Sequence, residues 1–110
     1  MNRIDPDHSI IDQPWTYDVT GFSYHRSVSD PEDRWLDLVL CKGTEVRRLR
    51  FLRPQKISVS EDFPECLGLY IADVSARGLE GLRVHVGDFE ACGGGIEFWA
   101  ADVVDLDSVE

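Results

Sequence analysis

The chain has few of the features that mark metal binding, disulfide scaffolds or membrane insertion. Its 110 residues include three cysteines, Cys41, Cys66 and Cys92, with no CxxC or CxH pair among them. This spacing argues against a structural zinc site, and three thiols do not make a disulfide scaffold. No apolar run approaches the ~18 residues of a membrane span, and none resembles a signal peptide. We therefore expect a cytoplasmic protein with reduced thiols and no membrane association.

Bases are scarce in residues 61–110, where Arg77 and Arg83 stand against twelve acids. Residues 1–60 carry nine acids and nine bases, so the net charge of −10 belongs to the second part of the chain. A field of this sign repels phosphate, which argues against nucleic-acid binding, and it would steer a basic protein partner. Solubility alone is the alternative explanation.

Amphipathic helices are also lacking. Strand-forming windows recur about every ten residues, at 15–26, 35–41, 44–52, 56–60, 67–75 and, as a hairpin around a glycine loop, 82–106. About seven short strands at this spacing predict an all-β fold, a single antiparallel β-sandwich or small barrel, with at most one helical turn at 75–81. We expect one domain over residues 14–107, after a loose lead-in at 1–13 and before an acidic tail at 108–110.

Alternation within these windows predicts which side chains face the core. Leu36, Leu38 and Leu40 share one strand face, and Lys42-Gly43 then turns the chain into a hairpin. Gly21 marks a bulge in the strand before them. Ile57 and Val59 are expected to point inward, and the window 67–75, apolar on both faces, is expected to be a central strand.

One basic cluster stands out, Arg47, Arg48, Arg50 and Arg53. Nucleic-acid binding would need a positive domain, and the rest of the chain opposes it. The cluster is better explained as a solvated strand face that pairs with acids on a neighbouring strand. Pairing with the acidic hairpin of a second copy is the alternative.

The hairpin at 82–106 has two apolar faces. Ile96 and Phe98, with Leu82, Val84 and Val86, would form the core face. The opposite face would hold Arg83, His85, Gly87, Phe89, Glu97, Trp99, Ala101 and Val103. The other sheet is expected to cover this face. If it is open, it has the aromatic and acidic composition of a protein-binding patch. The candidate protein-binding residues are Asp88, Phe89, Glu90, Glu97, Trp99, Asp102 and Asp105.

No catalytic, metal or cofactor residue is indicated. Gly93–Gly95 is followed by a strand and has no nearby lysine, so it predicts a hairpin loop and not a phosphate cradle. The carboxylates lack the alternate spacing of a calcium loop. His85 is expected to be a surface histidine. We therefore expect no cofactor and no enzymatic activity.

The pattern RRLRF…ISVS…LGLYIADV…LRVHV…GGIEFWAADVVDL, within residues 45–106, resembles small acidic all-β immunity proteins of bacterial toxin systems. The strand block that carries the resemblance contains Ile96, Phe98, Ala100 and Val103. The resemblance implies a bacterial protein that binds without catalysis, its acidic face covering the basic active site of a cognate toxin.

Three functions stay open at this point. The first is a protein-binding module, such as an immunity-type inhibitor. The second is a homo-oligomeric structural or accessory subunit. The third is a small ligand-binding barrel or enzyme that uses His85 or the carboxylates, which would need a pocket of about 300 Å³ or more.

Overall fold

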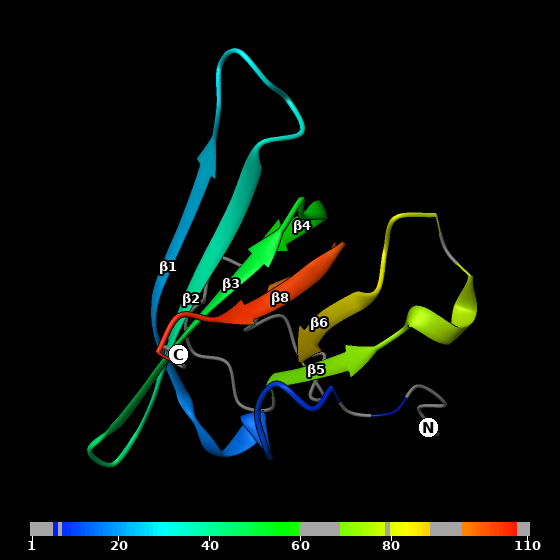
Figure 1. Ribbon diagram of the computed structural model, residues 1–110. Coiled ribbons are helices and arrows are strands. Elements are labelled where there is room, and N and C mark those ends of the chain that lie inside the picture. The colour runs from blue at the N-terminus through cyan, green and yellow to red at the C-terminus, as the bar shows by residue number, and fades with distance from the viewer. Residues whose placement is uncertain (1–5, 7, 60–68, 79, 89–95, 108–110) are drawn as a thin grey trace.

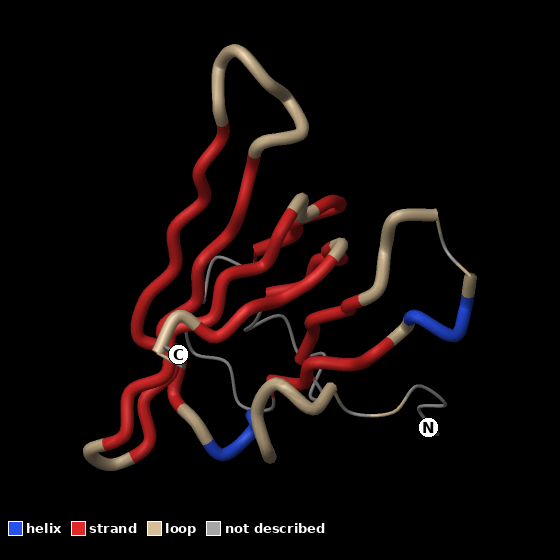
Figure 2. The backbone as a smooth tube through the Cα atoms, viewed as in Figure 1, coloured by secondary structure: helices blue, strands red, loops and turns tan. Residues whose placement is uncertain are grey.

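The computed structural model of the chain describes residues 6, 8–59, 69–78, 80–88 and 96–107. In this part of the chain, the backbone forms two four-stranded antiparallel sheets and two single-turn 3₁₀ helices (Figure 1). The tube view shows strands over most of the described length (Figure 2). The predicted antiparallel sandwich is confirmed, and the two separate sheets exclude the closed barrel. Helix η2 (Ser75–Arg77) is the predicted helical turn, whereas η1 (Pro14–Thr16) was not predicted.

The strands divide between the sheets out of sequence order. The first sheet has the order β1-β2-β3-β8, with bounds Asp18–Arg26, Arg34–Lys42, Glu45–Leu52 and Asp102–Asp105. The second sheet has the order β4-β7-β6-β5, with bounds Gln55–Val59, Ile96–Ala100, Val84–Asp88 and Leu69–Asp73. The last two strands of the chain therefore belong to different sheets.

The core lies between the two sheets and follows the predicted alternation. The first sheet contributes the fully buried Leu36, Leu38, Leu40, Leu49 and Phe51. The second contributes Ile71, Val84, Val86, Ile96 and Phe98, all at most 2% exposed. The Phe51 and Phe98 rings meet edge to face, with centroids 5.0 Å apart. Burying side chains of this size stabilises the fold by about 1.5–3 kcal/mol each.

The second arm of the predicted hairpin 82–106 changes sheets at Ala100 and Ala101. The carbonyl of Ala100 accepts from Arg83 N–H at 3.0 Å, on the side of the second sheet. The next amide, Ala101 N–H, donates to Leu52 O at 2.8 Å in the first sheet. Strands that switch sheets in this way form the corners of sandwiches. The switch shifts the alternation by one residue, so Ala101 and Val103 are buried in the core and their predicted outward position is wrong.

Strand β4 also departs from the prediction. Ile57 and Val59 were expected to point into the core, yet they are 36% and 44% exposed. β4 is an edge strand, and its pairing with β7 shifts register between Gln55 and Ser58. Lys56 lies in that interval with φ of 55°. This left-handed residue forms a bulge, which twists the edge away from the opposite sheet.

Strand β5 is an edge strand, so its predicted central position is wrong. The edge of β5 that has no neighbouring strand forms backbone hydrogen bonds with the lead-in. His8 N–H donates to Ile71 O, and Asp73 N–H donates to Pro6 O, both at 2.8 Å. The described part of the lead-in also buries Ile11. The lead-in thus supplies the backbone partner that β5 lacks on its free edge.

Two glycines were predicted correctly. The register of β1 against β2 shifts between Val19 and Gly21, as expected of a bulge. A Cβ on Gly21 would lie 2.9 Å from Cγ2 of Val39, so a larger residue would push the strands apart there. At the β2–β3 turn, Gly43 has φ of 63°, the left-handed conformation that this hairpin requires.

Candidate functional site

Neighbouring strands bring four side chains together on the outer face of the second sheet. His85 on β6 lies opposite Trp99 on β7, and Tyr70 on β5 lies opposite Gly87. Glu97 precedes Trp99 by two residues and shares its face, because alternate residues of a strand point the same way. We call Tyr70, His85, Glu97 and Trp99 the His85 cluster.

Each side of the His85 ring has a partner. The ring stacks on Trp99, with centroids 4.1 Å apart and planes at 23°, and meets the edge of Tyr70 at 5.4 Å. Nε2 lies 3.0 Å from Glu97 Oε2, and Nδ1 lies 3.4 Å from the Tyr70 hydroxyl. The His85 side chain is only 13% exposed. It is on the outer face as predicted, but its neighbours cover it.

The absence of a side chain at Gly87 leaves the space that the Tyr70 ring occupies. A Cβ at position 87 would lie 2.5 Å from the Tyr70 hydroxyl oxygen and 2.6 Å from ring atom Cζ. Only glycine therefore lets the ring lie flat across β6 and reach His85. An aromatic ring over a glycine on the neighbouring strand is a recognised way to stabilise such a pair.

The position of Trp99 shows whether the first sheet covers this face. The opposite sheet packs on Val86 and Phe98, the inner face, so it does not cover Trp99, contrary to expectation. Trp99 is half-buried, and His85 supplies part of its cover. The outer face of the second sheet thus presents a partly exposed, rigidly held aromatic side chain.

The predicted protein-binding residues do not all lie on this face. Glu97 and Trp99 belong to the His85 cluster, and Asp88 ends β6. Asp102 and Asp105 lie on β8, at the edge of the first sheet. The remaining predicted residues, Phe89 and Glu90, lie outside the described residues, as does the Gly93–Gly95 loop.

The arginines of β3 are paired within the chain, as predicted. Arg50 Nε and Nη2 donate to the two carboxylate oxygens of Asp37 at 2.9 and 3.0 Å. Arg47 forms an ion pair with Asp105. Three of the four clustered arginines, the third being Arg48, therefore have carboxylate partners in their own subunit, which weakens the charge argument for pairing between copies.

Arg48 pairs with Asp107, beyond the end of β8. Its Nε and Nη2 donate to Asp107 Oδ1 at 3.0 and 2.7 Å, and its backbone N–H donates to Oδ2 at 2.7 Å. These hydrogen bonds, the side-chain ones first, lower the pKa of Asp107 below its ordinary value. Two of the acids of residues 61–110, Asp105 and Asp107, thus neutralise two of the four clustered arginines of the first sixty, Arg47 and Arg48.

The outer face of the first sheet carries its own aromatic stack. Trp35 on β2 stacks on His25, with ring centroids 5.3 Å apart and planes at 20°. The guanidinium of Arg50 lies 4.9 Å from the centre of the Trp35 ring. This tryptophan is therefore packed under a cation that is already paired with Asp37.

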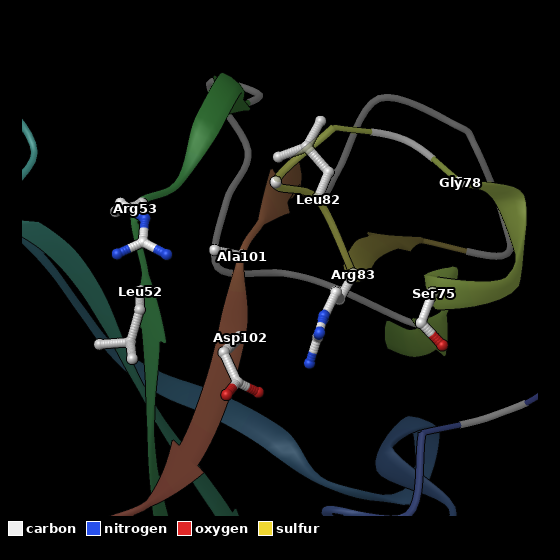
Figure 3. A pocket seen from close by; sticks show the side chains of 9 residues that line it. Leu52, Arg53, Ser75, Gly78, Leu82, Arg83, Ala101 and Asp102 are labelled. Carbon is white, nitrogen blue, oxygen red and sulfur yellow. The ribbon is translucent and has the colours of Figure 1, made fainter.

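A cleft of about 520 Å³ lies at the corner where the chain changes sheets (Figure 3). It is lined by Leu52, Arg53, Ser75, Gly78, Gly81, Leu82, Arg83, Ala101 and Asp102. It exceeds the minimum size that a ligand-binding role requires, so that alternative stays open. Of its lining residues, the sequence prediction named only Asp102 as a site residue. One signal pointed to Arg83, since it is one of only two bases in residues 61–110.

Other classes of site are not seen in the part of the chain that the structure describes. There, no group of three or more His, Cys, Asp or Glu side chains is placed to hold a metal ion. No helix among the described residues is long and apolar enough to cross a membrane. Comparisons with family models, with curated proteins and with solved structures found no match to this chain. The resemblance to immunity proteins therefore stays a prediction.

Proposed function

We propose that this protein is a non-catalytic binding module, of the immunity-inhibitor kind, that docks a basic protein partner on the outer face of its second sheet. The observation that carries the proposal is Trp99, half-buried on a face that the opposite sheet does not cover and held against His85 at 4.1 Å. Tryptophan is among the residue types most enriched at the energetic hot spots of protein interfaces.

Rigidity favours Trp99 as an anchor. Stacking on His85 restricts its rotamers before any partner arrives, and His85 is itself held by Glu97 and Tyr70. A side chain that is already ordered loses little conformational entropy on binding. The cluster is therefore organised to bind, with Trp99 as the apolar contact.

The acid of the cluster would select a basic partner. Glu97 is 58% exposed and lies on the same strand face as Trp99. It has no lysine or arginine within ion-pair distance among the described residues. The net charge of −10 would accelerate encounter with a cationic protein.

The same cluster supports binding over catalysis. A general base needs one ring nitrogen directed at a substrate. In His85, both nitrogens already face side chains of the chain itself, Glu97 at 3.0 Å and Tyr70 at 3.4 Å. We therefore propose no enzymatic activity, and a bacterial cytoplasmic location in which the thiol of Cys41 stays reduced.

The test begins with the product of the gene adjacent to this one, purified and titrated by calorimetry against the whole chain. Raising salt from about 50 mM to about 300 mM should weaken binding at least about tenfold, since a steered, charged interface is screened. Glu97→Gln should weaken it several-fold at low salt. Asp18→Asn, an exposed acid on β1 of the first sheet, is the matched control and should have little effect.

Two results would contradict the proposal. One is a partner whose affinity is indifferent to salt. The other is a partner whose affinity falls as much with Asp18→Asn as with Glu97→Gln, which would move the interface away from the second sheet.

A further inference from the structure

The corner cleft differs in chemistry from the rest of this acidic protein. Two of its lining side chains are arginines, Arg53 and Arg83, and one is a carboxylate, Asp102. Leu52, Leu82 and Ala101 add an apolar part to its wall. Figure 3 shows Arg53 and Arg83 on either side of Ala101, one at the end of β3 and the other at the entrance to β6.

Neither arginine is neutralised as those of β3 are. Within the described residues, no carboxylate lies within 4.0 Å of the guanidinium of Arg53 or Arg83. Asp102 lines the same cleft, but its Oδ1 accepts from Val103 N–H at 2.8 Å. The cleft therefore gathers two cations and the partly engaged Asp102, and Asp73 lies close enough to Arg83 for the arginine to help lower its pKa.

The backbone of both arginines is fixed. Arg83 N–H donates to Ala100 O at 3.0 Å, and Arg83 O accepts from Val74 N–H at 2.8 Å. Arg53 N–H donates to Arg34 O at 3.0 Å, and Arg34 Nε donates to Pro54 O at 3.1 Å. The backbones of these two strand ends, one from each sheet, are thus joined to their neighbours, and their exposed arginine side chains extend from fixed points on either side of the corner.

Arg53 is also held in an unfavourable conformation. Its φ of 50° lies in the left-handed region, where glycine is the preferred residue. Residues kept in this region against their preference are concentrated at binding sites and other functional positions. The chain thus places a long cationic side chain at a position where a glycine would relieve strain.

We propose that this cleft binds a small oxyanion, a carboxylate or a phosphate group, between Arg53 and Arg83. Guanidinium groups recognise both through paired N–H donors. The volume of about 520 Å³ suits a ligand that carries the anion on a short apolar body, which Leu52 and Leu82 would contact. The proposal is independent of protein docking on the outer face of the second sheet.

The net charge of −10 does not forbid such a site. Charges farther than about 8 Å are largely screened at physiological ionic strength, so the two nearest guanidiniums dominate the local field. The acids of the protein would instead disfavour anions that bind without a close pair of arginines. The field therefore adds selectivity for a ligand that reaches both Arg53 and Arg83.

The experiment is an NMR titration of the ¹⁵N-labelled whole chain, in chloride buffer at about 0.15 M ionic strength, with inorganic phosphate and, separately, with succinate. We expect saturable shifts at the amides of Gly78, Gly81 and Ala101, with a Kd of about 1 mM. Phosphate binding more tightly than succinate would indicate a phosphate ester as the ligand class. The reverse order would indicate a carboxylate, and either order supports the site.

Variants separate this cleft from the rest of the surface. Arg53→Gln and Arg83→Gln should each raise the Kd at least about fivefold, the loss expected when one charged donor pair is removed. Arg48→Gln removes the same charge from an arginine paired with Asp107 and should leave the Kd within about twofold. Arg53→Gly keeps the backbone conformation and should also lose affinity, so a failure to fold is not confused with a loss of binding.

The proposal is overturned if neither anion gives saturable shifts. It is also overturned if the shifts saturate equally in Arg53→Gln, Arg83→Gln and Arg48→Gln, because the anion would then bind elsewhere.

Discussion

On the outer face of the first sheet, the charged side chains that face one another are matched within the chain. Arg50 meets Asp37 with two hydrogen bonds, and its guanidinium covers Trp35. On the outer face of the second sheet, among the residues that the structure describes, the one contact between a basic and an acidic side chain joins His85 to the exposed Glu97. Trp99 there is stacked on a histidine and not under a paired arginine.

This difference shows that the distribution of charge along the sequence does not predict its distribution over the folded protein. Residues 61–110 carry the whole net charge, yet Asp105 and Asp107 return to the first sheet and neutralise Arg47 and Arg48. An acid that remains on the second sheet, Glu97, is one that a partner could use. The comparison between the two outer faces therefore carries the functional argument.

The largest expected effect is on the core that lies between the two sheets. Phe98→Ala should lower the free energy of unfolding by about 3–5 kcal/mol, because the ring is fully buried and meets Phe51 edge to face. Urea denaturation measures the change. A loss under about 1 kcal/mol would mean that the faces of β7 are reversed, with Trp99 inside and Phe98 outside.

The next test concerns the packing that holds the second outer face. Gly87→Ala should cost about 1–3 kcal/mol, because the new Cβ would meet the Tyr70 ring at 2.5–2.6 Å. In a Tyr70→Ala background the same change should cost little. A double-mutant cycle measures the coupling, and additive costs would show that Tyr70 does not lie over Gly87.

A smaller effect is expected for the matched charges of the first face. A double-mutant cycle of Arg50→Ala and Asp37→Ala should give a coupling of about 0.5–1 kcal/mol, since the pair is bidentate but only partly covered from solvent. The coupling should shrink at about 1 M salt. A coupling near zero at low salt would remove the contrast between the two faces.

The smallest effect is a pH dependence at the end of β5. Hydrogen bonds from the Ser75 hydroxyl and amide, at 2.6 and 2.9 Å, lower the pKa of Asp73 below its ordinary 3.8. Because the folded-state pKa is depressed, the stabilisation is present above about pH 4 and is lost as pH falls through the folded pKa. Asp73→Asn should therefore flatten the loss of stability in acid, as followed by urea midpoints.

Ser75→Ala, which removes only the hydroxyl donor, should give a slope between those of the wild type and Asp73→Asn. Identical slopes for all three proteins would show that these hydrogen bonds do not influence the carboxylate.

Much of the architecture could be predicted from local patterns. Alternation in β2 and β6 placed their core residues correctly, because each strand stays in one sheet with one face buried. The sheet change at Ala100 and Ala101 escaped prediction, since two adjacent small residues fit either phase of the alternation. The exposure of β4 also escaped, because the conformation of Lys56 is set by the pairing with β7 and not by its own type.

The candidate sites were harder to predict, for a physical reason. The His85 cluster depends on the register of three strands, which alternation alone does not specify. The corner cleft joins Arg53, Ser75, Arg83 and Asp102 from four separate parts of the chain. Sequence analysis identified Glu97 and Trp99 because they lie on one strand, where residues two apart are neighbours on the same face.

The central claim is that Trp99, and not Trp35, is the docking tryptophan, and one measurement tests it most directly. Calorimetry should compare the affinity of the adjacent gene's product for Trp99→Ala and for Trp35→Ala, since each tryptophan stacks on a histidine on an outer face. We expect Trp99→Ala to weaken binding by about 2 kcal/mol or more, roughly thirtyfold, and Trp35→Ala by less than about 0.5 kcal/mol. Equal losses, or a larger loss for Trp35→Ala, would contradict the account.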